Sequence, residues 1–299
     1  MAFQHKPLSD QVIVLTGASS GIGLATAQAA ARAGAKLVLA ARSEQTLQEV
    51  VARLADSQCE AAYVVADVGQ RQDVLRIADA AIQRFGRIDT WINNAGISIY
   101  ARLDQVSEED AKRLFDTNFW GVVFGSLVAL PHLRSGGGAL INVGSEVSEA
   151  VIPLQGIYAA SKHAVKGFTD ALRVEIEELD NAPVTITLIQ PTAVDTPFPD
   201  HARNYLAQEV KLPTPQIDPE KVADAILHAA THGGRDVKVG AVAMLNTLAA
   251  KLMPSVADKL AAAQADRQLV EDQPPHNPEG ALYRPSNDGR VHGSDGPRH

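Results

Sequence analysis

Two side chains near the middle of the sequence are spaced to exchange a proton with a substrate. Tyr158 and Lys162 lie four residues apart in a helical pattern, which places them on one face of the predicted helix, one turn apart. A tyrosine phenol is a weak acid with an unperturbed pKa of about 10, and a nearby ammonium group lowers that pKa by stabilising the phenolate. Such a pair can give a proton to a carbonyl oxygen, or take one from an alcohol, while a hydride moves. Taken alone, such a pair is more often a packed ring beside a solvated amine. Other residues are therefore needed to distinguish a catalytic pair from a structural one.

Two further polar residues are candidates for the same site. Ser145 follows the predicted strand 139–143, at the strand end that faces the ligand crevice of a doubly wound sheet. A hydroxyl there can donate to an oxyanion that develops on the substrate. Asn118 lies in the middle of a long helical pattern, where a side-chain amide could hold a local kink or a water molecule. From the residue alone, an exposed helical asparagine is the simpler interpretation.

A glycine-rich turn follows the first predicted strand, 12–16, and reads TGASSGIG. In this context we expect Gly17 to permit a tight turn, Gly21 to let the backbone approach a pyrophosphate, and Gly23 to let the next helix pack closely on the sheet. The helix N-terminus offers free N–H groups and a positive dipole end to phosphates. The turn therefore predicts a dinucleotide site in preference to a merely structural turn. The candidate contacts in the turn are Gly17, Ser19, Ser20, Gly21, Ile22 and Gly23.

The end of the second predicted strand, 36–41, indicates which dinucleotide is bound. An NAD site usually has an acidic residue there that accepts a hydrogen bond from the ribose 2′-hydroxyl. Here the strand ends at Ala41, Arg42 follows, and no acid occurs before Glu44. A guanidinium can pair with a 2′-phosphate that an acidic side chain would repel. The sequence thus favours NADP(H), with a solvated surface arginine as the alternative reading of Arg42.

The candidate residues are spread over an alternation of strands and helices. Strands are predicted at 12–16, 36–41, 61–66, 90–93, 139–143, 184–190 and 236–239, and helices at about 20–33, 43–57, 70–85, 107–133, 155–180 and 219–231. This alternation predicts right-handed crossovers and an α/β fold, a doubly wound seven-stranded parallel sheet of the Rossmann type. The strands are near-continuous apolar runs, as expected when helices cover both faces of a sheet.

The chain is expected to form a single domain with a C-terminal extension. Residues 1–240 are predicted to be the dinucleotide-binding and catalytic domain, and 241–270 one or two amphipathic helices broken near Pro254. Residues 271–299 form a tail rich in proline and glycine, which cannot build a core of its own and is either disordered or laid across another surface. Within the tail, 277–283 is a candidate docking patch. The extension carries an apolar stripe that favours packing against protein, made by Leu245, Leu248, Leu252, Val256 and Leu260.

These strings resemble the short-chain dehydrogenase/reductase family, specifically its single-domain branch, over about residues 8–240. The glycine turn matches the family's TGxxxGxG motif, residues 93–96 match its NNAG string, and Tyr158 and Lys162 match its YxxxK motif. Ser145 stands 13 positions before Tyr158, which is the family's spacing. The agreement of several linked motifs in the right order makes the resemblance specific for fold and reaction class.

The resemblance implies a role for each matching residue. Tyr158 is implied to be the acid–base group, and Lys162 to tune it and bind the nicotinamide ribose. Ser145 is implied to polarise the substrate oxygen, and Asn118 to anchor a water molecule in a proton relay to Lys162. Further implied cofactor contacts are Asp67 and Val68 at the adenine ring, Asn94 beside the cofactor, and Val194 and Thr196 at the nicotinamide carboxamide.

Composition narrows the class of protein. The chain has 299 residues, 45% of them hydrophobic, enough for one large α/β core. Its net charge of −8 and its lack of a basic patch argue against nucleic-acid binding. A single cysteine, Cys59, suits a reducing compartment, and the longest apolar stretch, 121–130, is too short to span a bilayer. We therefore expect a cytoplasmic protein with no membrane span, and no metal site, since His276, His292 and His299 are scattered.

The expected activity is the NADP(H)-dependent interconversion of a ketone or aldehyde and an alcohol, on a small-molecule substrate that the sequence does not identify. One alternative is a non-catalytic, dinucleotide-binding redox sensor or scaffold, which the C-terminal extension alone supports. Others are an NAD-linked dehydrogenase or an epimerase on the same fold. The resemblance also implies a homodimer or homotetramer that pairs the helices at 107–133 and 155–180.

Overall fold

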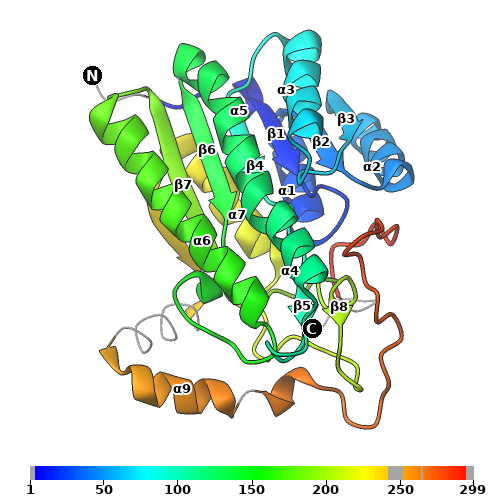
Figure 1. Cartoon of the computed structure of the whole chain (residues 1–299). Coiled ribbons are helices and arrows are strands. Elements are labelled where there is room, and N and C mark those ends of the chain that lie inside the picture. The colour runs from blue at the N-terminus through cyan, green and yellow to red at the C-terminus, as the bar shows by residue number, and fades with distance from the viewer. Residues whose placement is uncertain (1–3, 242–251, 264, 294–299) are drawn as a thin grey trace.

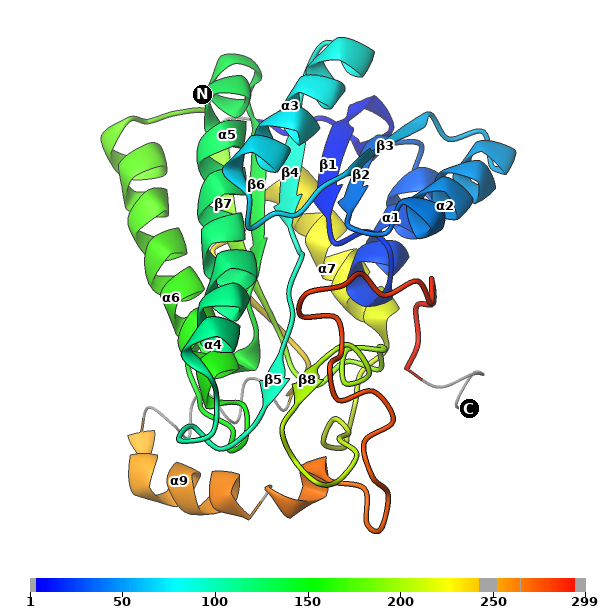
Figure 2. The same ribbon diagram turned by 45° about the vertical axis from the view of Figure 1, so that its right-hand side comes forward.

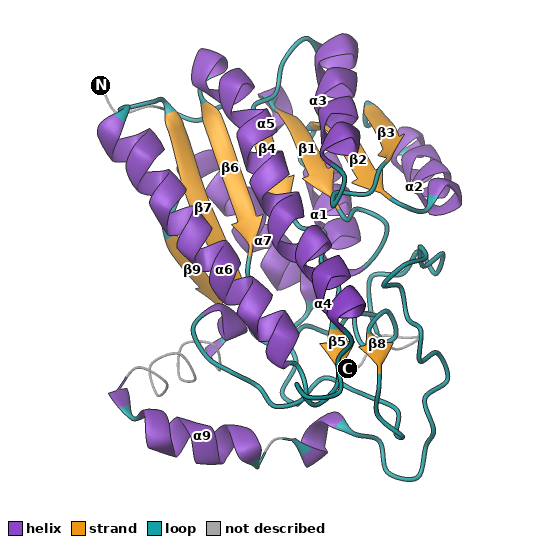
Figure 3. Ribbon diagram, viewed as in Figure 1, coloured by secondary structure: helices purple, strands orange, loops and turns teal. Residues whose placement is uncertain are grey.

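Seven parallel strands form the central sheet of the molecule (Figures 1 and 3). The structure, a computed structural model, describes residues 4–241, 252–263 and 265–293. The strand order is β3-β2-β1-β4-β6-β7-β9, so the order reverses between β1 and β4 and the predicted doubly wound sheet is confirmed. The strands are β1 Val12–Thr16, β2 Lys36–Ala41, β3 Ala61–Val65, β4 Thr90–Asn93, β6 Gly138–Val143, β7 Val184–Pro191 and β9 Asp236–Val239.

Helices cover both faces of this sheet, as Figure 2 shows. Helices α1, α2 and α7 pack on one face, and α3, α5 and α6 pack on the other. Because the strand order reverses between β1 and β4, right-handed crossovers place the helices of the two halves on opposite faces. The helices are α1 Gly21–Arg32, α2 Glu44–Asp56, α3 Arg71–Phe85, α4 Glu108–Phe115, α5 Gly121–Gly136, α6 Gly156–Arg173, α7 Pro219–His232 and α9 Pro254–Ala262.

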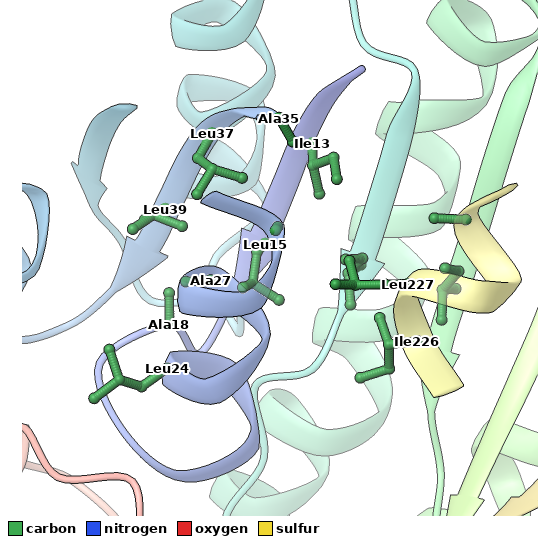
Figure 4. Packing of buried hydrophobic residues seen from close by; sticks show 14 of the residues in the cluster. Ile13, Leu15, Ala18, Leu24, Ala27, Ala35, Leu37, Leu39, Ile226 and Leu227 are labelled. Atoms are coloured by element: carbon green, nitrogen blue, oxygen red, sulfur yellow. The ribbon is translucent and has the colours of Figure 1, made fainter. Parts of the chain in front are cut away.

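Strand β1 shows why the strands are apolar without interruption. Ile13 and Leu15 point into the cluster formed with α1 and α7, whereas Val14 belongs to the cluster on the opposite face. Figure 4 shows Ile13 and Leu15 together with Leu24 of α1 and Ile226 of α7. All of these side chains are buried, and each contributes about 1.5–3 kcal/mol to folding by leaving water. The two clusters hold the strand ends, and so the loops of the site, in fixed positions.

Helices α4 and α5 form one continuous helix that contains a π-helical turn at Asp116–Trp120. The local distortion considered for Asn118 is therefore present, and its side chain is buried. A second π-helical turn, Val174–Leu179, follows α6. By length and composition the helix Glu108–Gly136 could cross a membrane, but 61% of its apolar window is buried within the molecule, as in a helix packed against the core.

A second, two-stranded parallel sheet pairs β5, Ile99–Tyr100, with β8, Arg203–Asn204. The sequence did not reveal it, because strands of two residues carry no periodicity. In the extension, α9 starts at Pro254, where a break was expected. Leu252 and Val256 are exposed, so this part of the predicted stripe does not pack on the sheet, while Leu245 and Leu248 lie outside the described residues. The tail runs from α9 past β8 to the start of α1 (Figure 2).

Candidate active site

A cleft lies at the carboxyl ends of the strands, where the strand order reverses. This is the position at which doubly wound sheets bind ligands. The cleft is lined by every site residue predicted from the sequence except Asn118, which lies behind its wall. The predicted residues that line it are Gly17, Ser19, Ser20, Gly21, Ile22, Gly23, Arg42, Asp67, Val68, Asn94, Ser145, Tyr158, Lys162, Val194 and Thr196.

The glycine turn between β1 and α1 is closed tightly on itself. Gly17 has a φ of +68°, a left-handed conformation that residues with a Cβ rarely adopt. A Cβ on Gly23 would lie 2.0 Å from the carbonyl oxygen of Gly17, so only glycine lets α1 start this close to the turn. The Asn94 amide donates to the carbonyl oxygens of Thr16 and Gly17 at 3.0 and 3.2 Å. Asn94 thus ties the end of β4 to the turn and helps to hold its shape.

Tyr158 and Ser145 face each other across the substrate end of the cleft. Burial raises the pKa of Tyr158 to about 12, the Ser145 hydroxyl opposes that rise, and the nearby charge of Glu146 adds to it. The Tyr158 ring lies beside that of Phe198, with 5.6 Å between centroids. At neutral pH the phenol is therefore protonated and placed to act as an acid.

Lys162 lies beneath Tyr158, as the four-residue spacing predicts. Its ammonium donates to the carbonyl oxygen of Val143 at 2.9 Å and lies 5.8 Å from the Tyr158 ring centroid. Burial lowers the pKa of Lys162 to about 8. The expectation that the ammonium brings the Tyr158 pKa below its usual value is wrong for this arrangement, because burial acts more strongly on the phenol than any neighbouring charge. Burial penalises the charged form of both side chains.

Asn118 binds the backbone of the loop after β4 and a side chain of α6 beside the site. Its side-chain oxygen accepts from the Ile97 N–H, and its amide donates to the Ile97 carbonyl, both at 2.9 Å. The amide also donates to the hydroxyl of Ser161 at 3.1 Å. This fully buried side chain joins the loop after β4 to α6, next to the turn that carries Tyr158 and Lys162. An exposed helical asparagine is excluded.

Arg42 points into the adenosine end of the cleft, but its partners come from the C-terminal tail. It donates to the carbonyl oxygen of Leu282 at 3.1 Å and to that of Ala281. Burial lowers the pKa of Arg42, with the nearby Asp67 carboxylate opposing this effect. Asp67 pairs with Arg113 of α4, whose Nε donates to the same Leu282 oxygen at 3.1 Å. Arg113 and the tail were missed as parts of the site, since nothing in the local pattern relates them to Arg42.

The described residues fit a dinucleotide. The turn presents the N-terminus of α1, a guanidinium stands where a 2′-phosphate would be recognised, and no acid occupies that position. The hydroxyl of Thr117 is buried at the cleft and has no hydrogen-bond partner among the described residues. The substrate end is largely apolar and includes Val147, Ile152, Phe198, Leu212 and Pro213. A buried polar end beside an apolar end suits a ligand whose reacting carbon carries apolar substituents.

Comparison with known proteins agrees with this geometry. The family described as short chain dehydrogenase matches residues 11–206. The uncharacterized oxidoreductase YxnA of Bacillus subtilis (strain 168) is 46% identical over 286 residues, which cover 93% of this chain and 79% of that protein.

Two solved structures also resemble the chain. A short chain dehydrogenase/reductase from Burkholderia phymatum in complex with NAD has a TM-score of 0.73 and 27% identity, covering 84% of this chain and 96% of its own. An alcohol dehydrogenase from the archaeon Thermococcus sibiricus, complexed with 5-hydroxy-NADP, has a TM-score of 0.66 and 29% identity, covering 77% and 94%. These two relatives carry different nicotinamide dinucleotides, so the likeness itself does not choose between NAD and NADP.

Proposed function

The chain belongs to the short-chain dehydrogenase/reductase family of oxidoreductases that bind a nicotinamide dinucleotide, and on that premise we propose an NADP(H)-dependent enzyme that interconverts a ketone or aldehyde and an alcohol. The observation that carries the proposal is that Tyr158, Ser145 and Lys162 line the same cleft, with the Lys162 ammonium 5.8 Å from the Tyr158 ring centroid. Arg42, in place of an acid after β2, supports NADP(H) over NAD.

The dinucleotide, when bound, supplies or accepts the hydride. In the direction of reduction, Tyr158 gives its phenolic proton to the carbonyl oxygen, and the Ser145 hydroxyl donates a hydrogen bond to the same oxygen. The Lys162 ammonium stabilises the phenolate that remains. Because the pKa of Tyr158 is about 12, the enzyme rests with the phenol protonated, ready for reduction. Oxidation of the alcohol reverses these proton movements and requires the phenolate.

The proposal is tested by Tyr158→Phe. This change removes the hydroxyl and keeps the ring that packs beside Phe198. We expect kcat for ketones and aldehydes with alkyl or aryl substituents to fall by about 10²–10⁴, the usual contribution of general acid–base catalysis. NADPH affinity should stay within about twofold. Tyr63→Phe, a matched loss of a hydroxyl on β3 that bonds to Gln48 and does not line the cleft, should leave both quantities unchanged. Full activity of Tyr158→Phe would refute the proposed site.

We also infer a cytoplasmic homodimer or homotetramer. Exposed apolar side chains lie on the two long helical segments expected to pair, and they include Trp120, Leu127, Val174 and Leu179. Exposed apolar groups of this size usually mark a contact surface when they are contiguous. Light scattering after gel filtration gives the mass in solution, and a monomer at micromolar concentration would contradict the inference.

A further inference from the structure

The C-terminal tail ties the two rims of the cleft together. On one rim, in the chain that follows β7, the His201 carbonyl accepts from the Ala281 N–H at 2.8 Å, and Asp200 pairs with the Arg290 guanidinium. On the other rim, Ser43 at the start of α2 is hydrogen-bonded to Asn287. Residues 281–290, here termed the strap, therefore connect the two rims, and Ala281, Pro285 and Ser286 line the cleft. The red segment of Figure 2 follows this path from β8 to the start of α1.

The strap caps the donors that the phosphates of a dinucleotide require. The Gly21 N–H, at the start of α1, donates to the Arg290 carbonyl at 3.0 Å. Both Arg42 and Arg113 donate to the Leu282 carbonyl at 3.1 Å, and Arg42 reaches the Ala281 carbonyl as well. One neutral oxygen thus lies between two guanidinium groups. An anionic phosphate oxygen is a stronger partner for each of these donors than an amide carbonyl is.

The strap is packed into the cleft through a buried leucine. Leu282 is fully buried in an apolar cluster that also contains Ile97 and Leu114. Ala281, Pro285 and Ser286 of the strap line the cleft together with the glycine turn and Arg42. The seated strap therefore occupies part of the space at the proposed dinucleotide site.

We propose that the strap and the dinucleotide compete for the same site, so that the strap leaves Gly21 and Arg42 whenever NADP(H) binds. The inference rests on the proposed use of Arg42 for the 2′-phosphate. The Gly21 N–H carries one hydrogen, which it donates to the Arg290 carbonyl, so this carbonyl must leave before a phosphate can accept from the same N–H. At Arg42 the strap carbonyls occupy the nitrogens Nη1 and Nη2, with which a phosphate would pair. The apparent dissociation constant then equals the intrinsic one divided by the fraction of molecules with the strap open.

Hydrogen–deuterium exchange tests the competition directly on the full-length protein. We expect amides in peptides spanning 278–293 to exchange faster when the protein is saturated with NADPH, because the Ala281 N–H loses its partner. Peptides of the glycine turn should exchange more slowly in the same samples. Unchanged or slower exchange of 278–293 in the complex would overturn the proposal, because the strap would then lie over the cofactor without competing with it.

A matched pair of variants tests it through affinity. Arg290→Gln removes the tie to Asp200, whereas Arg284→Gln makes the same charge change at an exposed position of the same strap. We expect Arg290→Gln to lower the apparent Kd for NADPH at least about threefold and to speed association, with Arg284→Gln like wild type. Leu282→Ala, which empties the buried anchor, should lower the Kd further, and circular dichroism checks that it folds. Weaker or unchanged NADPH binding by both strap-loosening variants would count against competition.

The two proposals fail in different ways. If NADPH and NADH bind neither wild type nor Leu282→Ala, the proposed function falls and competition falls with it. If NADPH binds wild type but exchange in the strap slows, only the competition is wrong. If wild type binds weakly and Leu282→Ala binds tightly, both are supported. NADH serves as a second probe, because its pyrophosphate also requires the Gly21 N–H and must displace the strap.

Discussion

Replacing Arg42 with alanine should remove most of the preference for NADPH over NADH. In the structure two guanidinium nitrogens of Arg42 donate to the carbonyls of Ala281 and Leu282. Binding of a 2′-phosphate exchanges these two neutral acceptors for anionic ones, and charged pairs of this kind are roughly twice as strong as bonds between neutral groups. A gain of about 1 kcal/mol per bond amounts to about 2 kcal/mol for the two bonds. This energy corresponds to about 30-fold in affinity.

The assay is the titration of NADPH and NADH into the purified protein, followed by nicotinamide fluorescence. The informative quantity is the ratio of the two dissociation constants, because the loss of Arg42 also loosens the strap, which changes both constants by the same factor. We expect the ratio Kd(NADH)/Kd(NADPH) to fall by about 30-fold. Arg113 keeps a positive charge near the same oxygen, so NADH should not overtake NADPH.

Two controls sharpen this test. Arg53→Ala removes the same charge from an exposed position near the end of α2 and should leave the ratio unchanged. Ala41→Asp places a carboxylate at the end of β2, where it can accept from a ribose 2′-hydroxyl and repel a phosphate, so it should shift the ratio toward NADH. If Arg42→Ala leaves the ratio as it is in wild type, the arginine serves only to hold the strap and the NADP(H) assignment is refuted.

Three further predictions follow from the site. The pKa of Lys162 is lowered to about 8, so its ammonium is present below that pH and lost above it. We therefore expect kcat/KM for carbonyl reduction to decline as the pH rises through about 8. The pH profile of Lys162→Arg should show no such decline, because the guanidinium stays charged. Asn118→Ala leaves the buried N–H and C=O of Ile97 without partners, and urea unfolding should show a loss of about 2–4 kcal/mol, with a loss under 1 kcal/mol contradicting its positioning role. Gly23→Ala brings a Cβ against the Gly17 oxygen and should abolish NADPH binding in calorimetry, whereas Gly167→Ala, at an exposed helical position with open space, should bind normally.

Much of the fold could be read from local patterns. Strands β1, β2, β4 and β9 begin and end at the predicted residues. The first three are short, mostly buried apolar runs, whereas β9 alternates polar and apolar residues at the edge of the sheet. The order of motifs along the chain was enough to predict the seven-stranded sheet and the family, which the match over residues 11–206 confirms. The assignment of roles to Tyr158, Ser145 and Lys162 stays a prediction, although the three lie together.

Other features depend on contacts between distant parts of the chain. The role of Asn118 depends on Ile97 and Ser161, which the sequence does not place beside it. The helical spacing of Tyr158 and Lys162 predicts that they share a face, but how deeply they are buried decides their pKa values, and the spacing misjudged the direction for Tyr158. Arg42 alone suggested a phosphate partner, yet in the fold it bonds to carbonyls 239 and 240 positions away.

The sequence by itself determined the properties that depend on neighbours within about a turn or a strand. These are the apolar strands, the glycines of a turn that tolerates no side chain at Gly23, and the one-turn spacing of a phenol and an amine. Only the tertiary structure decided what surrounds those groups, because burial and hydrogen-bond partners are supplied by segments far away along the chain. The strap shows this most clearly. Its composition left open whether the tail is disordered or lies across another surface, with 277–283 as a candidate docking patch, and the cleft that it crosses exists only when the sheet is assembled.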